Sequence, residues 1–345
     1  MKLLRKSATL AAAIAAIAGM GLAGEASADV YAGSKLEISN LTLAISGVTG
    51  GAGITGFTFN LDNTATLNGV SATTPGISST CNNLLPTCAV SPASPLTAVA
   101  ANAPGSTIQR VDGSATNFSF FGPNGTDTFA NSDSEILTAQ LIDGVPTSTV
   151  QISEAQIAGS GTAQSSTNVQ SNTQFTFTFN IDDTGGTLVL DFDANPALYV
   201  AVNTLNLIGA LAQANTGASF ALTSTNGTSV RWTPDGIKGN AFSSCLGVTS
   251  CTENNDDESL NNTVGLPGGN PVSVGISDAR SGNDLGVSDF GITIAGLQEG
   301  SYSLTLAATS SVNVVQRVPE PGVLSLLGAG LAGFGLIRRR KSRKS

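Results

Sequence analysis

The chain has 345 residues, a formal net charge of −9, only 11% charged residues and no histidine. Without histidine it lacks Ser-His-Asp and Cys-His nucleophile systems, histidine-ligated zinc or copper, and the commonest general base near neutral pH. Its abundant Asn, Ser, Thr and Gly and its few aromatic residues are typical of an exported β protein with polar loops rather than of a cytosolic enzyme.

The N-terminus has the pattern of a secretory signal peptide. Three basic residues precede or flank the start of the mostly apolar stretch 8–23, and Ala26 and Ala28 stand at the small-residue positions that a signal peptidase reads. The sequence therefore predicts that residues 1–28 are removed and that the mature chain begins at Asp29.

The mature chain opens with an alternating apolar pattern over residues 34–46. The alternation changes phase at Ser39 and Asn40, which predicts one long strand with a β-bulge at that point. A strand followed by a turn is predicted over residues 56–64. Residues 71–106 hold five of the thirteen prolines and show little periodicity, so they are predicted to form a long loop.

The middle of the chain is predicted to contain several more strands. Residues 147–157 alternate with a phase slip at Glu154. The clearest pattern is the aromatic alternation of residues 175–181, and residues 188–192 are predicted to pair with it as a hairpin across the turn residues 182–186. Two shorter strands are predicted at 117–121 and 135–141.

The second half of the chain also has strand patterns. Residues 199–211 are apolar and fit a strand or a short helix equally, while Asn226-Gly227 is the strongest hairpin signal in the chain. Residues 233–270 are predicted to form a second long loop, which contains the acidic run 253–258. The last predicted strands are 272–276, 287–295, 302–308 and 312–315.

These elements predict an all-β fold over residues 29–316, an antiparallel β-sandwich or a jelly-roll-like fold, because many short strands with frequent turn signals characterise such folds. A similarity between segments 57–64 and 177–184 leaves open whether the domain consists of two similar halves. Tyr302 follows a glycine-bounded turn at the start of a late strand, where sandwich folds place a tyrosine corner. A surface position for Tyr302 fits the sequence equally well.

The four cysteines form two close pairs, Cys81/Cys88 and Cys245/Cys251. In an exported protein they predict disulfides, most simply within each pair, with long-range bridging between the pairs as the alternative. The spacings are wide and no further cysteine or histidine is present to complete a tetrahedral zinc site.

Aspartates gather at the predicted strand ends, among them Asp62 and Asp183. Asp191 and Asp193 share one face of a strand and lie about 7 Å apart along it. Together with Asp182 they are candidate Ca²⁺ ligands, because Ca²⁺ takes about six to eight oxygen ligands. A Ca²⁺-dependent glycan-binding module is therefore the alternative function. The simpler interpretation is that these carboxylates are solvated turn residues.

The sequence shows no catalytic constellation. A G-x-S-x-G nucleophile turn is lacking, as is a base for it, and a glycosidase would need two carboxylates facing each other across one cleft. Trp232, the only tryptophan, is predicted to be a core residue rather than a sugar platform. The sequence therefore predicts a protein that is not an enzyme and has no cofactor, with Ca²⁺ as the one candidate ligand.

Residues 318–345 combine three features in order. Pro319, Glu320 and Pro321 precede the uncharged apolar stretch 323–337, and six of the last eight residues are Lys or Arg. As a helix, the apolar stretch would be about 22 Å long, which is short for a hydrocarbon core of roughly 30 Å. A basic cluster stays on the cytoplasmic side, so the tail predicts a stop in membrane transfer. The tail begins with Arg338, Arg339, Arg340 and Lys341.

This arrangement resembles the PEP-CTERM sorting signal of exported bacterial proteins. The resemblance implies recognition by a membrane-embedded cysteine protease of the exosortase type and cleavage near Pro319-Glu320-Pro321. It also implies transient anchoring in the inner membrane by a C-terminal helix, followed by delivery to the cell surface or an exopolysaccharide matrix. It indicates a destination for the protein and leaves its molecular role open.

Removal of both ends would leave six basic and 22 acidic residues, so the mature chain has a net charge near −16. Nucleic-acid binding needs a basic footprint and is excluded on this ground. We therefore expect an exported, non-enzymatic protein of the surface or the exopolysaccharide matrix.

Overall fold

The computed structural model describes most of the chain between Asp29 and Gln316. The described residues are 29–46, 53–82, 97–111, 118–124, 127–138, 147–159, 161–177, 185–202, 210–239, 242–267, 272–277 and 288–316. The predicted signal peptide and the predicted C-terminal helix lie outside these ranges. Within the ranges, no helix is long and apolar enough to cross a membrane.

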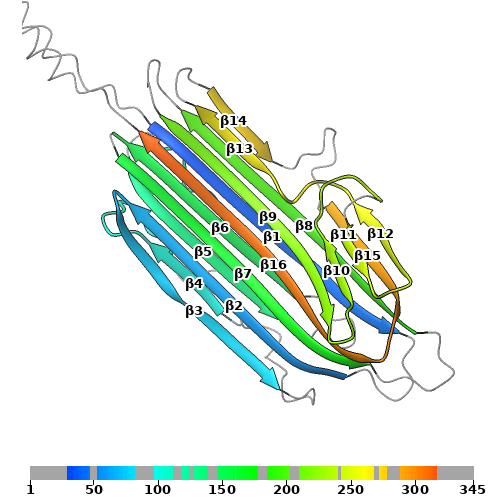
Figure 1. Cartoon of the computed structure of the whole chain (residues 1–345). Coiled ribbons are helices and arrows are strands. Elements are labelled where there is room, and N and C mark those ends of the chain that lie inside the picture. The colour runs from blue at the N-terminus through cyan, green and yellow to red at the C-terminus, as the bar shows by residue number, and fades with distance from the viewer. Residues whose placement is uncertain are drawn as a thin grey trace, which may run out of the picture.

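Two antiparallel sheets of eight strands each pack face to face (Figure 1). Sheet A has the order β12-β15-β8-β1-β6-β5-β4, and β14 also pairs with β8. Its strands are β1 (Asp29–Ser46), β4 (Thr97–Asn102), β5 (Phe129–Thr138), β6 (Thr147–Ala158), β8 (Gly186–Val202), β12 (Ser250–Asp256), β14 (Val272–Ser277) and β15 (Ser288–Leu297).

Sheet B has the order β11-β10-β9-β16-β7-β2-β3, and β13 also pairs with β9. Both sheets combine strands from the first and the second half of the chain, and the predicted all-β, antiparallel class is confirmed. The strands of sheet B are β2 (Gly53–Leu67), β3 (Val70–Asn82), β7 (Gly161–Phe177), β9 (Leu211–Ser224), β10 (Ser229–Trp232), β11 (Phe242–Leu246), β13 (Thr263–Pro267) and β16 (Gly300–Gln316).

Three local predictions are confirmed. The register of β1 against both neighbours shifts between Ile38 and Thr42, and Asn40 has a φ of 52°, as the predicted bulge requires. The Asn-Gly turn joins β9 to β10, and Gly227 has a φ of 89°. Tyr302 is 2% exposed, and its hydroxyl donates to the Gln298 carbonyl at 2.6 Å, which forms the tyrosine corner.

The predicted hairpin between residues 175–181 and 188–192 is wrong. Strand β7 pairs with β2 and β16 in sheet B, whereas β8 pairs with β1 and β15 in sheet A. Turn-forming residues signal a change in chain direction, but they do not specify which sheet the next strand joins. Residues 302–308 and 312–315, which were predicted as two separate strands, belong to one strand, β16.

The two predicted long loops, 71–106 and 233–270, are shorter than expected. The first contains most of β3 and all of β4, and the second contains β11, β12 and β13. All of these strands lie at or near sheet edges, where fewer side chains are buried, so their apolar alternation is weak. Residues 118–121, predicted as part of a strand, form none, and residues 199–202 continue β8.

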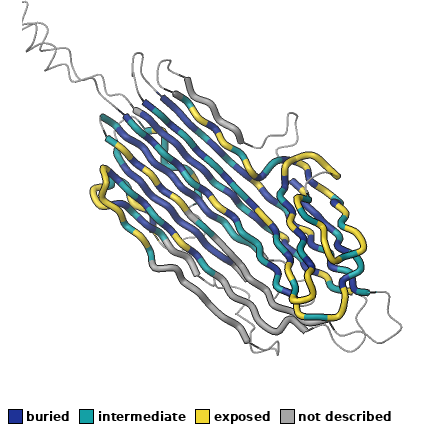
Figure 2. The backbone as a smooth tube through the Cα atoms, in the orientation of Figure 1, coloured by how far each residue is buried: buried dark blue, intermediate teal, exposed yellow. Residues whose placement is uncertain are grey.

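The interior between the sheets contains two apolar clusters of different character. Along the long strands, buried and less buried residues alternate (Figure 2), as two stacked sheets require. One cluster, here called the aromatic cluster, includes Phe192, Phe220, Trp232 and Phe290. The other, here called the alanine cluster, consists of ten alanines and nine Val, Leu and Ile residues.

Five buried serines lie next to the alanine cluster, and we call them the serine seam. Two of them, Ser34 and Ser310, lie between the alanine cluster and the aromatic cluster. Each hydroxyl donates to a backbone carbonyl of the opposite sheet. The bonds are Ser34 to Asn215 (2.6 Å), Ser310 to Ser34 (2.8 Å), Ser153 to Ser310 (3.0 Å), Ser165 to Glu154 (3.1 Å) and Ser132 to Thr64 (3.2 Å).

The seam requires the two sheets to approach closely. Facing sheets are ordinarily about 10 Å apart, with large side chains between them. Here one serine side chain and one hydrogen bond span the gap. On the inner face of β1, Ser34 lies between Ala32 of the alanine cluster and Leu36 of the aromatic cluster. Small side chains on one side of the seam and large ones on the other therefore match a narrowing interior.

The seam also joins the first strand of the domain to the last. Strand β1 begins and strand β16 ends at the same end of the domain (Figure 1). Ser34 and Ser310 bond each other across the sheets, with 2.8 Å between their hydroxyl oxygens. The two sheets are therefore complete only once the chain has been extended to Gln316.

Replacement of Ser310 by alanine should lower the free energy of unfolding by about 1–2 kcal/mol, because it removes the hydroxyl that bonds Ser34. The matched control is Thr309→Ala, whose side chain points outward and is exposed; it should change stability by less than ~0.5 kcal/mol. Urea unfolding of both variants measures the difference. Equal losses would show that the seam contributes nothing specific.

Candidate functional site

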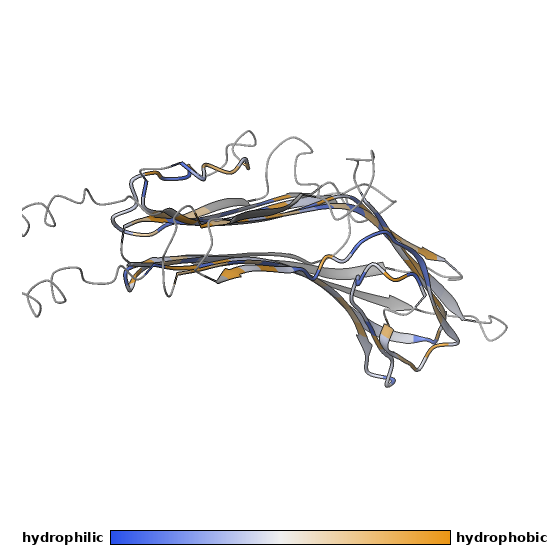
Figure 3. Cartoon of the chain, turned by 90° about the horizontal axis from the view of Figure 1, so that it is seen from above, coloured by the Kyte–Doolittle hydropathy of each residue, from blue (hydrophilic) through white to orange (hydrophobic). Residues whose placement is uncertain are grey.

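The most connected polar site lies on the outside of sheet A. A stretch of chain covers part of the outer face of one layer (Figure 3), and its contacts with β6 identify its described parts as residues 103–111 and 118–124. Arg110 of this stretch forms an ion pair with Glu154 of β6, with 2.6 Å between nitrogen and oxygen and both side chains 0% exposed. We call these two residues and their partners the latch.

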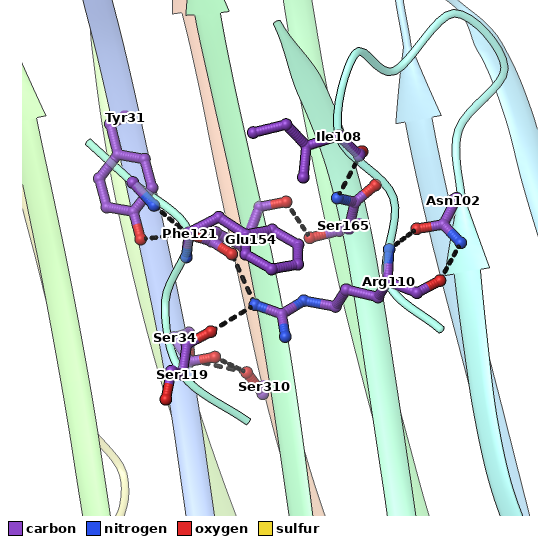
Figure 4. A network of polar contacts seen from close by, with 12 residues as sticks. Tyr31, Ser34, Asn102, Ile108, Arg110, Ser119, Phe121, Glu154, Ser165 and Ser310 are labelled. Atoms are coloured by element: carbon purple, nitrogen blue, oxygen red, sulfur yellow. Dashed lines mark hydrogen bonds and ion pairs between the residues drawn. The ribbon is translucent and has the colours of Figure 1, made fainter. Parts of the chain in front are cut away.

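Glu154 accepts hydrogen bonds with both carboxylate oxygens (Figure 4). Oε2 faces Arg110, while Oε1 accepts from the Tyr31 hydroxyl at 2.7 Å and from the backbone N–H groups of Phe121 and Gly122 at 2.7 and 2.9 Å. This array compensates for the removal of the carboxylate from water, since a buried charge must be paired and hydrogen-bonded.

Arg110 is held from several directions. Its guanidinium donates to the Ser119 carbonyl at 3.0 Å and lies 4.3 Å from the centre of the Phe121 ring. Asn102 of β4 bonds the backbone of Arg110 on both sides, accepting from its N–H at 2.7 Å and donating to its carbonyl at 2.8 Å. The planar guanidinium thus joins the covering stretch to the sheet below.

The hydrogen bonds of the latch keep the protons of its side chains in place and do not transfer them. Burial, and next the charge of Glu154, raise the pKa of Tyr31 well above its ordinary value, so the phenol remains a neutral donor. On the same face, Gln156 accepts from Asn124 N–H at 3.1 Å and donates to Asp127 O at 3.0 Å. The geometry supports attachment of the covering stretch, with every bond directed at the protein itself.

Sequence reasoning missed the latch. The slip in the apolar alternation at Glu154 does not mark a β-bulge, because β6 keeps continuous register with β1 and β5 through this residue. Ser153 faces the interior and Glu154 faces the covering stretch, so both faces of the strand are buried. The signal that the sequence offered was a single charged residue, Glu154, in the middle of a strand whose other residues are all uncharged.

The acidic run 253–258 organises a neighbouring loop. Glu253 accepts from the Trp232 indole N–H at 2.5 Å and from the backbone N–H of Gly239. Oδ2 of Asp256 accepts from the N–H groups of Asp235 and Gly236, each at 3.0 Å. These carboxylates therefore fix residues 233–239 against the sheet, and Trp232 is a core residue as predicted, at 1% exposure.

The aspartates predicted as Ca²⁺ ligands are only partly brought together. Asp191 and Asp193 lie on the outer face of β8, on either side of the buried Phe192, and Asp193 accepts from Asn40 Nδ2 at 2.5 Å. Asp182 and Asp183 lie outside the described residues, and Asp62 lies on β2 in sheet B. Over the described ranges, no group of three or more His, Cys, Asp or Glu is arranged to hold a metal ion.

One predicted disulfide is confirmed. Cys245 and Cys251 are bonded, with 6.1 Å between their Cα atoms. They lie on β11 of sheet B and β12 of sheet A, so the bond closes one edge of the domain. Cys81 lies on β3, and Cys88 lies outside the described residues, so the pairing of these two stays a prediction.

A double-mutant cycle tests the latch. Arg110→Met should lower the free energy of unfolding by roughly 3–5 kcal/mol, because it leaves a buried carboxylate without its cation. In a protein that already carries Glu154→Gln, Arg110→Met should lower the free energy of unfolding by about 1–3 kcal/mol less than it does in the wild type. The control is Lys35→Met, which breaks the partly exposed Lys35–Glu37 pair at 3.0 Å and should cost less than ~1 kcal/mol. Additive losses would contradict the pairing.

Asp256 should make stability depend on pH. Burial, and secondarily the charge of Glu253, raise the pKa of Asp256 from 3.8 to about 6. Between these values the unfolded chain has already lost the proton that the folded chain keeps, so stability falls as pH rises and levels off above pH 6. As the pH rises from about 4 to 7, the free energy of unfolding of Asp256→Asn should increase by roughly 1–2 kcal/mol relative to that of the wild type. Parallel stability curves for the two proteins would contradict this.

Comparison with known proteins adds one match. The family model described as the PEP-CTERM protein-sorting motif matches residues 317–341. No curated protein and no solved structure matches the chain. The sorting signal expected from Pro319, Glu320, Pro321 and the basic tail is therefore confirmed as a motif. The chain carries a PEP-CTERM protein-sorting motif directly after its last described strand.

Proposed function

We propose that this protein is an exported, non-enzymatic component of the cell surface or the exopolysaccharide matrix. In this proposal, an exosortase-type membrane protease reads the C-terminal motif and cuts near Pro319-Glu320-Pro321. The motif itself implies export and membrane-linked sorting.

The observation that carries the proposal is the boundary between the motif and the fold. Strand β16 ends at Gln316, and the motif begins at residue 317. Removal of the chain from the Pro-Glu-Pro tripeptide onward would leave whole all sixteen strands that the structure describes. A sorting signal that is discarded must be dispensable for the fold, and this position meets that requirement.

The placement of the chain ends supports the same proposal. Strand β1 begins and β16 ends at one end of the domain (Figure 1). A membrane segment after Gln316 would hold this end next to the bilayer and leave the rest of the domain outside. The net charge near −16 of the mature chain favours separation from an anionic membrane surface once the anchor is cut.

The non-enzymatic role is supported by the contacts of three of the six buried carboxylates that the structure describes. Glu154, Glu253 and Asp256 each accept hydrogen bonds from backbone or side-chain groups that hold covering segments in place. A general acid or base must instead face a substrate within hydrogen-bond reach. In this proposal, the protein contributes binding and structure to its surroundings.

Mass spectrometry of the C-terminus tests the proposal. In cells that contain the sorting protease, the protein should lack the residues after the Pro-Glu-Pro tripeptide and be recovered outside the inner membrane. In cells without the protease, and for Glu320→Ala, the full-length C-terminus should remain with the membrane. Glu299→Ala, the same change at a site before the motif, should be processed normally. An intact C-terminus in protease-containing cells would contradict the proposal.

A further inference from the structure

The outer face of sheet B is a broad surface of uncharged polar side chains. It is formed by four long neighbouring strands, β2, β7, β16 and β9. Its outward side chains are at least partly exposed. Most of them carry hydroxyl or amide groups, among them Thr64, Gln164, Ser166, Thr305, Thr309 and Asn313.

The lack of charge on this face is unusual for this chain. Asp62 is the only charged residue among the outward side chains described on these four strands, although the mature chain has a net charge near −16. The outer face of sheet A differs, since its exposed or partly exposed residues include several charges. These are Lys35, Glu37, Asp191, Asp193 and Asp289.

The polar groups of this face are arranged in register. Strand β16 pairs with β7 and β9 along nearly its whole length without a register shift. Outward side chains therefore repeat about every 7 Å along a strand and about 4.8 Å between strands. Amide groups bond their neighbours, as Gln164 does with Asn313 at 3.1 Å and Asn215 with Ser311 at 3.2 Å. These bonds orient the remaining donors and acceptors before any ligand arrives.

We propose that the outer face of sheet B binds a neutral polysaccharide in an extended conformation. This inference rests on the proposed function, because it names the matrix component that the exported protein would contact. Sugar hydroxyl groups both donate and accept hydrogen bonds, as do the hydroxyl and amide groups of this face. The extended, repetitive surface matches an extended, repetitive polymer. A nearly uncharged face also matches a polymer that carries no charge.

The same face is poorly suited to other classes of partner. Protein interfaces are anchored by aromatic residues and arginine in a desolvated centre. The outward side chains described on the four strands include no aromatic residue and no cation, and the largest apolar pair, Leu211 with Val315, lies at one end. A polyanion would need basic groups. A neutral polymer can be bound through hydroxyl and amide groups, which this face has, and it needs no basic group.

Binding by this face should be weak for each sugar and strong for a long polymer. Each hydrogen bond replaces one to water and contributes little net free energy. Successive sugars engage the repeating rows together, and linked contacts increase the overall affinity through effective concentration. A matrix protein of which many molecules bind along one polymer would be retained in the matrix without a deep binding pocket.

Affinity electrophoresis tests this proposal. Protein recovered from the producing cells, in whichever C-terminal form they accumulate, is run through gels containing dextran, hydroxyethyl cellulose, galactomannan or alginate. At least one of the three neutral polymers should retard it, and the anionic alginate should not. The triple variant Ser166→Ala, Thr305→Ala, Thr309→Ala should bind that polymer at least about three-fold more weakly, because it removes three central hydroxyls.

The matched control is Ser39→Ala, Thr42→Ala, Thr293→Ala on the outer face of sheet A, which should be retarded like the wild type. Urea unfolding of both triple variants identifies any that fail to fold. Retardation by alginate alone, no retardation by any neutral polymer, or equal binding of the two triple variants would each overturn the proposal. Binding in this experiment does not depend on C-terminal processing. A negative result would therefore overturn the binding proposal and leave the proposed function to its own test.

Discussion

The close contact between the two sheets at the serine seam constrains the rest of the structure. A hydroxyl that reaches a carbonyl of the facing sheet admits no larger side chain between the two backbones. The alanine cluster lies on one side of this contact and the aromatic cluster on the other. Interiors pack as densely as organic crystals, so the residue sizes on each side must follow the distance between the sheets.

The seam explains how very long strands remain in one arrangement. A uniformly apolar interior would tolerate a slip between sheets, because one aliphatic contact resembles the next. Hydroxyl-to-carbonyl bonds have a defined geometry, and a slip would leave buried polar groups without partners. The latch extends the same logic to the outside of sheet A, where Glu154 places the covering stretch over β6.

The two outer faces differ in covering and in charge. Sheet A is partly covered by residues within 103–111 and 118–124, and its remaining outer surface carries charges. In the part of sheet B that the structure describes, the outer face is polar and almost uncharged. With the sorting motif following β16 at one end, the protein presents this long face to its surroundings while the chain ends lie together.

Local signals in the sequence predicted local features well. The phase change at Ser39-Asn40, the Asn226-Gly227 turn and the placement of Tyr302 each depend on a few neighbouring residues, and each is confirmed. The sorting motif was predictable for the same reason, because its three parts are contiguous.

Features that depend on contacts distant in sequence were not predictable. The seam serines come from five strands in both sheets, and a serine in a strand ordinarily indicates a solvent-facing position. Glu154 disturbed the expected alternation because a segment more than thirty residues away covers it. The acidic run was predicted to lie in a loop, whereas Glu253 and Asp256 lie on β12 and accept hydrogen bonds from the loop beside them.

Native-state hydrogen exchange of the Ser310→Ala variant tests the coupling of the sheets most directly. Ser310 lies on β16 of sheet B, and the hydroxyl that the variant removes donates to Ser34 on β1 of sheet A, next to β6. If the seam holds the sheets together, the amides of β1 and β6 should lose protection to the same extent as those of β16. A loss confined to β16 and its neighbours within sheet B would contradict the account.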